Sequence, residues 1–255
     1  MVDVIYPVIL SALAGLATGL GALLISLIGK LEGKFLGFVM GFAGGVMLAV
    51  SFLELFADSL EMIPVAWVTG FFVVGAVLMM ALDLLLPHVE FGEWERGVHD
   101  AGLFKGGMLV TIGMSLHNIP EGLIVSAGYS HEPALGFFIA VMICFHNIPE
   151  GIASVTPMIA SGMDKRKAVI ITALSGMTEP IGALLGASAI QFAGDNPFII
   201  GASLAFAAGV MTYITLDELI PMAHQVCEPA FKHYISSGVI CGIIFAQVVS
   251  ILIGS

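Results

Sequence analysis

The hexapeptide HNIPEG occurs twice in the chain, within GMSLHNIPEGLIVSAG (113–128) and within VMICFHNIPEGIASVTP (141–157). On an α-helix, residues three and four positions apart share a face, so the His, Asn and Glu of each copy lie close together. The proline between them removes a backbone donor and leaves a carbonyl in the preceding turn without its helical partner. Each copy therefore places one ring nitrogen and several oxygens on one side of an otherwise apolar segment.

The residues around the two motifs have the composition of a membrane protein. Of the 255 residues, 58% are apolar and 11% are charged, whereas about 25% of the residues in soluble domains are charged. A helix needs about 20 residues to cross the hydrocarbon layer. The sequence predicts an all-α polytopic membrane protein, a single transmembrane domain over 1–255, with eight spans at about 5–28, 35–57, 65–86, 107–128, 134–160, 168–192, 198–223 and 234–254.

The same composition argues against other classes of protein. Basic and aromatic residues are too sparse for a nucleic-acid partner, and the net charge of -11 includes many acids inside apolar runs. The three cysteines form no CxxC pair and suggest no disulfide framework. Cys144 lies two residues from His146, roughly on the opposite side of a helix, which argues against a copper(I) site.

The positions of the basic residues predict the topology. All eight Lys and Arg residues fall in connections that follow an odd-numbered span. By the positive-inside rule these connections are cytoplasmic, so both termini are expected to be extracytoplasmic. The longest connection, at about 87–106, contains His88 and His99. It is interpreted either as a solvated loop or as a weak capture site for a departing cation.

Two internal repeats predict the architecture. The HNIPEG copies lie on adjacent spans, which cross the membrane in opposite directions. FAGGVMLAVSFLELF (42–56) also aligns without gaps to FAAGVMTYITLDELI (206–220), on the second and seventh spans. We therefore expect a 3+2+3 inverted repeat with a two-fold axis in the membrane plane, the architecture of alternating-access transporters. Chance similarity between helices rich in small residues is the alternative.

Three glutamates are predicted near the middle of the membrane, one in each motif and one on the sixth span. A charged residue at that depth costs about 2.5–3.5 kcal/mol on insertion scales, and the predicted spans contain no Lys or Arg to neutralise it. A bound divalent metal ion offsets this charge; a polar packing network is the alternative. The expected ligands are His117, Asn118, Glu121, His146, Asn147, Glu150 and Glu179, with Met47 as a weak soft ligand or a core residue.

The ligand types narrow the choice of metal. Imidazole and carboxylate suit zinc and iron, and additional carboxylate and amide oxygens suit manganese or iron(II). Seven side chains exceed one tetrahedral shell, which favours two neighbouring ions that share Glu121 and Glu150. Acids at span ends are candidates for metal access and release, although solvated helix ends explain them equally well: Glu54, Asp58, Asp217 and Glu218.

These residues resemble the ZIP family of zinc- and iron-regulated metal transporters over nearly the whole chain. The His-Asn opening of the second motif and the segment LDELIPMA (216–223) are similar to the bacterial ZupT-like branch. The resemblance implies a binuclear centre with Met47 nearby. A zinc site would use His117, Glu121, His146 and Glu150, and an iron(II) site would use Asn118, Glu121, Asn147, Glu150 and Glu179. Where relatives have a long histidine-rich cytoplasmic loop, this chain has only two histidines, His88 and His99, between the third and fourth spans.

The expected function is transport of divalent transition-metal ions, zinc together with iron(II), manganese, cobalt or cadmium, into the cytoplasm through a binuclear site between the fourth, fifth and sixth spans. The metals are cargo, and no cofactor or enzyme activity is expected. The lipid bilayer of the cell membrane, or of the inner membrane in a Gram-negative source, is a partner, and a homodimer is left open.

A membrane-embedded metal-dependent hydrolase is the main alternative, but the motif reads HxxxE rather than HExxH. A metal sensor is a third, with no visible output domain.

Overall fold

The helices form because hydrocarbon offers the backbone no hydrogen-bonding partner, so N–H and C=O groups must be satisfied within each helix. The structure, a computed structural model, describes residues 4–29, 32–85, 101–160, 162–193 and 196–253, and none of these lies in a β-strand. The α-helices are α1 (Ile5–Ile28), α2 (Gly33–Ala49), α3 (Phe56–Met62), α4 (Val65–Leu85), α5 (Ala101–His131), α6 (Pro133–Ala160), α7 (Lys165–Gly176), α8 (Glu179–Ala193), α9 (Pro197–Ile214), α10 (Ile220–Val226) and α11 (His233–Ile253).

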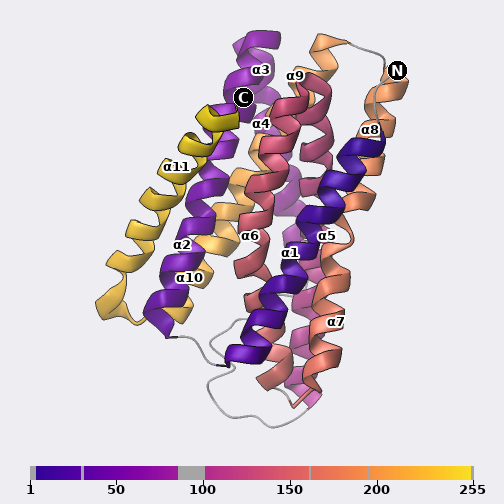
Figure 1. Cartoon of the computed structure of the whole chain (residues 1–255). Coiled ribbons are helices and arrows are strands. Elements are labelled where there is room, and N and C mark those ends of the chain that lie inside the picture. The colour runs from indigo at the N-terminus through magenta and orange to yellow at the C-terminus, as the bar shows by residue number, and fades with distance from the viewer. Residues whose placement is uncertain (1–3, 30–31, 86–100, 161, 194–195, 254–255) are drawn as a thin grey trace.

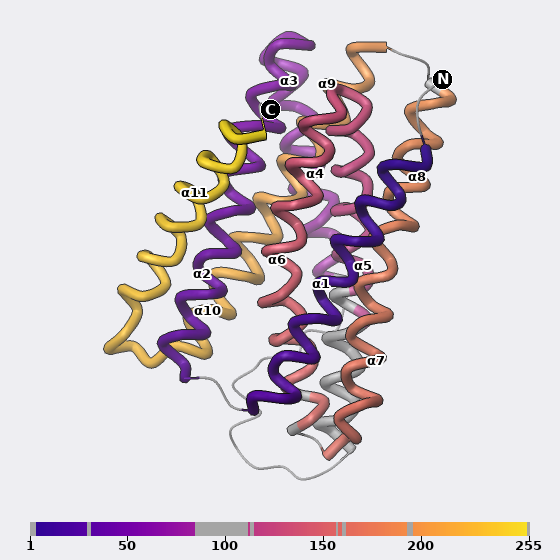
Figure 2. The backbone as a smooth tube through the Cα atoms, in the orientation of Figure 1, coloured from indigo at the N-terminus to yellow at the C-terminus, as the bar shows by residue number. Residues whose placement is uncertain are grey.

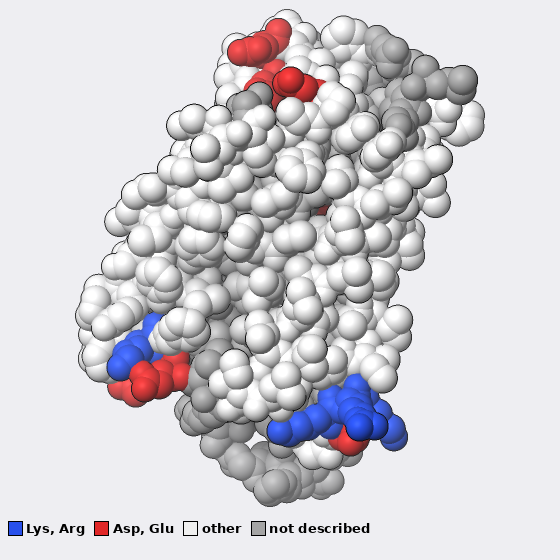
Figure 3. Space-filling view, viewed as in Figure 1, with Lys and Arg blue, Asp and Glu red and all other residues white. Residues whose placement is uncertain are grey.

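Seven helical segments of the described chain are long and apolar enough to cross a membrane. The helix α5 carries the first HNIPEG copy and runs alongside them (Figure 1). Both termini lie at one end of the bundle, and the described Lys and Arg side chains gather at the other end (Figures 1 and 3). Between the two ends the visible surface is a broad band almost without charged residues; one small, recessed acidic spot shows through near its middle (Figure 3). The seven segments are Ile5–Ile28, Gly33–Met62, Val65–Leu84, Pro133–Thr156, Lys165–Phe192, Pro197–Val226 and His233–Ile253.

Two helix boundaries differ from the sequence-based expectation. The helix α5 begins at Ala101, so the connection predicted to reach 106 ends earlier; Lys105 is a good helix former and does not stop the helix. Within the predicted span 168–192 the helix is interrupted, because α7 ends at Gly176 and α8 begins at Glu179, although the whole segment Lys165–Phe192 is long and apolar enough to cross a membrane. The break precedes Pro180, which lacks an N–H and disfavours helical geometry in the residue before it. His88 and His99 lie outside the described residues.

The helices pack in two groups. In the central group, α5 and α6 contact each other, α1 packs against α6, and α8 packs against α5, with α7 on α1. In the flanking group, α2 packs against α11, and α4 packs against α9. The helix α6 lies between α1 on one side and α2 on the other (Figure 2). The first and sixth predicted spans therefore belong with the two motif helices rather than with their sequence neighbours.

Glycines set the spacing of the closest helix pairs in a repeated pattern. A Cβ at Gly21 of α1 would collide with the carbonyl of Ile148 in α6, and a Cβ at Gly182 of α8 would collide with the carbonyl of Ile119 in α5. The two isoleucines occupy the same position of the HNIPEG motif. The flanking group repeats the arrangement with Gly45 against Val239 and Gly209 against Phe72.

A π-helical turn interrupts each of the two long segments that carry the second repeat. These turns are η1 (Val50–Leu55), between α2 and α3, and η3 (Thr215–Leu219), between α9 and α10. A hydroxyl near each turn donates to the carbonyl four residues earlier, Ser51 to Met47 and Thr215 to Met211, both at 2.8 Å. Such bonds bend helices, and π-turns are frequent at functional sites. Each turn contains a glutamate at the same aligned position.

Candidate metal centre

The packing of α5 against α6 brings the two HNIPEG copies together in the interior of the central group. All seven predicted ligands from α5, α6 and α8 are at most 2% exposed. Glycines of the motifs permit this close approach, because a Cβ at Gly122 would collide with the carbonyl of Glu179, and one at Gly151 with the carbonyl of Thr18. The first residue of α8 is thereby held against α5.

The Glu121 carboxylate lies between the two motif histidines. Its Oε1 is 3.2 Å from Nε2 of His146 and 3.8 Å from Nε2 of His117. On the other motif, Oε2 of Glu150 is 3.7 Å from Nε2 of His146. Ligand atoms of His117, Glu121 and His146 all lie within 4.8 Å of one another, so one small cation can reach all three.

The asparagines are oriented by backbone carbonyls, which only accept hydrogen bonds. Nδ2 of Asn118 donates to the carbonyl of Ser175 at 3.1 Å, and Nδ2 of Asn147 donates to the carbonyl of Ala14 at 3.0 Å. Asn147 also donates to Oε1 of Glu179. These bonds fix the amide planes, because a flipped amide would set oxygen against oxygen. Each Oδ1 atom is left without a hydrogen-bond partner.

Buried polar atoms without hydrogen-bond partners concentrate at this place. They include both carboxylate oxygens of Glu121 and of Glu150, Oε2 of Glu179, and both ring nitrogens of His146. An unsatisfied buried polar group costs about 1–3 kcal/mol and more when it is charged, and buried charges are normally paired or coordinate a metal. The arrangement therefore offers acceptor atoms to a cation, and in the described part of the chain the ion pairs of Glu121 and Glu150 are with histidines rather than with Lys or Arg.

The residues predicted for metal access and release lie in different surroundings. Oε1 of Glu218, in η3, is 3.6 Å from Nδ1 of His117, and its side chain is 28% exposed. Asp217 beside it is exposed. Glu54 of η1 is buried, and Asp58 of α3 is partly buried toward the end that holds the termini. Of these acids, Glu218 joins the centre to the surface.

Two further residues modify the sequence-based interpretation. Met47 is fully buried in a cluster of apolar residues that includes Val46 and Val50, a packing position; its role as a ligand stays a prediction. Asp83 of α4 is buried and accepts a hydrogen bond from the Tyr213 hydroxyl at 3.0 Å. Sequence reasoning did not single out Asp83, although an acid within the apolar run 65–86 was a signal.

The chain matches known proteins over most of its length. A family model described as ZIP zinc transporter matches residues 92–250. Proteins named zinc transporter ZupT from Salmonella newport (strain SL254), Salmonella heidelberg (strain SL476) and Salmonella enteritidis PT4 (strain P125109) are 36% identical over 241 residues, which cover 92% of this chain and 92% of each relative. This similarity, together with the seven apolar helical segments, identifies a multi-pass membrane protein of a transporter family rather than an enzyme. The chain belongs to the ZIP family, in its ZupT-like branch.

Proposed function

We propose that the protein carries zinc as its substrate across the cell membrane into the cytoplasm. The observation that carries this proposal is the convergence of buried, partnerless ligand atoms from α5, α6 and α8. The names of the relatives support zinc as the cargo. The interior potential favours inward movement of a cation by about 2.3 kcal/mol per charge per 100 mV, so the gradient acts twice on a divalent ion.

The proposed centre holds two neighbouring ions. The two imidazoles with Glu121 and Glu150 suit zinc. The free Oδ1 atoms of the asparagines, with Glu179 and the same two shared carboxylates, form an oxygen-rich neighbour that suits iron(II) or manganese. The fixed amide orientation supports this second position, because it presents oxygen rather than nitrogen. Cobalt and cadmium fit the same mixed ligand set.

The proposed topology has eight spans, with α5 as the span additional to the seven segments above. The described basic side chains lie at the end opposite to both termini, which by the positive-inside rule supports extracytoplasmic termini. The paired glycine contacts support an inverted repeat, because equivalent residues of the two halves make equivalent contacts. On this topology Glu54 and Asp58 serve access from outside, and Asp217 and Glu218 serve release.

A 3+2+3 plan suggests that the two three-span blocks rock against the two motif helices. The helix contacts favour a different moving unit. Because α1 packs on α6 and α8 packs on α5, the first and sixth spans move with the motif helices. We propose that the central group moves as one body relative to the flanking group. Such movement carries the ligands together and changes which π-turn glutamate lies beside them.

Zinc uptake into vesicles tests the function directly. The purified protein is reconstituted, a zinc-sensitive dye is enclosed, and uptake of Zn, Fe(II), Mn, Co and Cd is compared under an inside-negative potential. We expect saturable zinc uptake without any chemical product. Turnover of a peptide or lipid without zinc uptake would instead establish the metal-dependent hydrolase.

A further inference from the structure

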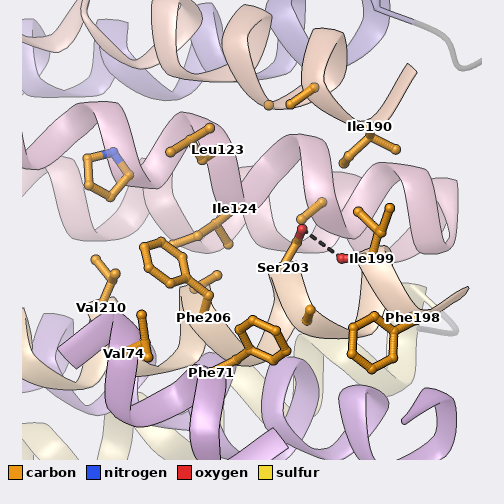
Figure 4. A pocket seen from close by; sticks show the side chains of 16 residues that line it. Phe71, Val74, Leu123, Ile124, Ile190, Phe198, Ile199, Ser203, Phe206 and Val210 are labelled. Atoms are coloured by element: carbon orange, nitrogen blue, oxygen red, sulfur yellow. Dashed lines mark hydrogen bonds between the residues drawn. The ribbon is translucent and has the colours of Figure 1, made fainter. Parts of the chain in front are cut away.

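An apolar cavity between the two helix groups has no part in the proposed metal path. Its volume is about 490 Å³, and it is lined by residues of α4, α5, α8 and α9. It is elongated along α9, with Val210 toward one end and Ile190 and Phe198 toward the other (Figure 4). The volume falls within the range of about 300–1,000 Å³ that is typical of small-molecule sites.

The lining of the cavity selects an apolar ligand. Among the described residues that line it, Ser203 alone has a polar side chain, and its hydroxyl donates to the carbonyl of Ile199 at 2.8 Å (Figure 4). A ligand with polar groups would therefore find no free hydrogen-bond donor on the lining side chains and would lose its bonds to water. A hydrocarbon chain loses nothing by entering.

The cavity opens toward the lipid. Val74 of α4 is 55% exposed, and Phe198 is 38% exposed; both line it. On helices that cross a bilayer, such side chains face hydrocarbon, so lipid tails are the molecules at the opening. An unfilled space would deprive the lining of dispersion contacts that an adjacent tail supplies.

The aromatic residues at one end place the opening at the level of the lipid headgroups. Trp67 contacts Phe71 and Phe198, with ring centroids 6.1 and 5.5 Å apart, and Phe198 is the second residue of α9. Tryptophan is enriched at membrane interfaces. From Phe198 to Val210, α9 rises about 18 Å at 1.5 Å per residue, somewhat more than half of the roughly 30 Å hydrocarbon thickness.

Small residues on α8 and α9, such as Gly186 and Ala202, leave room for this cavity. The aligned positions in the other half of the repeat carry larger residues, so the fold does not require small ones there. Aligning Gly209 with Gly45 pairs Ala202 of α9 with Phe38 of α2. Aligning Gly182 with Gly21 pairs Gly186 of α8 with Ile25 of α1, and Ile25 packs in a buried cluster with Leu36 and Ile152. The position of α1 that aligns with Gly186 therefore carries a large side chain that packs within the protein.

We propose that the cavity holds one acyl chain of a bilayer phospholipid, with its ester end at Trp67 and Phe198 and its tail directed toward Pro120. Pro120 lines the cavity and precedes Glu121 of the metal centre. This acyl chain would lie between α5 and α8 of the central group and α4 and α9 of the flanking group. Under the proposed transport function, it therefore separates the two bodies that move.

Photolabelling of the whole protein tests the site without reference to transport. The protein is placed in bilayers of phosphatidylethanolamine and phosphatidylglycerol with a small fraction of phosphatidylcholine carrying a diazirine near the ester or near the chain end. Labelled peptides are mapped by mass spectrometry. We expect the first probe to label the segment around Trp67 and Phe198, and the second to label 202–210 and 120–127. Identical or evenly distributed labelling by both probes would show annular lipid only and overturn the proposal.

A cavity-filling variant gives the second arm of the test. Ala202→Phe is expected to reduce chain-end labelling of 202–210 and 120–127 to the level of ordinary lipid-facing segments, whereas Ala81→Phe, on the exposed surface of α4 outside the cavity, leaves it unchanged. Ala189→Phe, from α8, repeats the filling independently if Ala202→Phe does not fold. Unchanged labelling in a folded filling variant contradicts the site. Zinc uptake does not enter the readout, so failure of the transport function leaves this result interpretable.

Discussion

The two π-helical turns have aligned sequences, yet they hold their glutamates in different surroundings. In η3, Glu218 lies 3.6 Å from His117 of the proposed metal centre, and its side chain is partly exposed. In η1, the aligned Glu54 is buried and interacts with the Ser250 hydroxyl of α11. A perfect two-fold repeat would place Glu54 beside His146, the counterpart of His117, instead of beside Ser250. The difference supports a conformation in which the centre communicates with the end that bears the basic residues.

The largest loss of zinc uptake is expected from a change to Glu121, because both proposed metal positions share its carboxylate. Glu121→Ala removes the carboxylate that lies between His117 and His146, and in the binuclear arrangement it removes a ligand from both ions. We expect zinc uptake to fall by more than the roughly 10–100-fold loss typical of changes to residues that support a metal ligand. Initial uptake rates in vesicles measure this, with equal insertion checked by immunoblot. Normal uptake by this variant would remove the shared ligand from the mechanism.

Glu218→Ala is expected to have the next largest effect, because it alters the π-turn that touches the centre. Loss of a carboxylate 3.6 Å from the His117 ring should lower the maximal rate of zinc uptake by about 10–100-fold. The adjacent, exposed Asp217→Ala is the matched control and should retain most of the rate. Equal losses in the two variants would mean that general negative charge, rather than contact with His117, is what matters.

The aligned segments and the grouping of the seven polar side chains were accessible from sequence because they depend on residue identity and helical spacing; that these side chains bind metal stays a prediction. HNIPEG fixes a shared face, and absent Lys and Arg leave Glu121, Glu150 and Glu179 uncompensated. The π-turns were not accessible, because one extra residue per turn barely alters an already apolar pattern. The asparagine orientation was also hidden, since it depends on how closely the Ser175 and Ala14 carbonyls approach across glycine contacts. Pro180 is visible in the sequence, but a proline alone does not show whether a membrane helix bends or, as here, is interrupted at Met177 and Thr178.

The two motif positions can be compared through metal selectivity. His146→Ala removes a nitrogen from the predicted zinc site and leaves the amide and carboxylate oxygens in place. We therefore expect a several-fold larger loss for zinc than for manganese, because oxygen ligands alone suit manganese. Competition between the two metals in the same vesicles measures the ratio. Asn147→Ala is the complementary change and should reduce manganese uptake more than zinc uptake. Equal losses of both metals in both variants would contradict two chemically distinct positions.

The smallest effect on zinc uptake is expected from a change to Glu54, because this π-turn glutamate, unlike Glu218, does not contact the proposed metal centre. Because its carboxylate is buried beside α11, Glu54→Ala should leave the maximal rate near that of wild type. Its proposed part in access from outside predicts instead a higher zinc concentration for half-maximal uptake. Full concentration curves separate the two parameters, with Glu61→Ala, another acid at the same end of the chain's second span, as the control. A drop in maximal rate as large as that of Glu218→Ala would show that both π-turn glutamates act at the centre during each transport cycle. The different surroundings of Glu54 and Glu218 would then belong to one stage of transport and would not reflect two different roles.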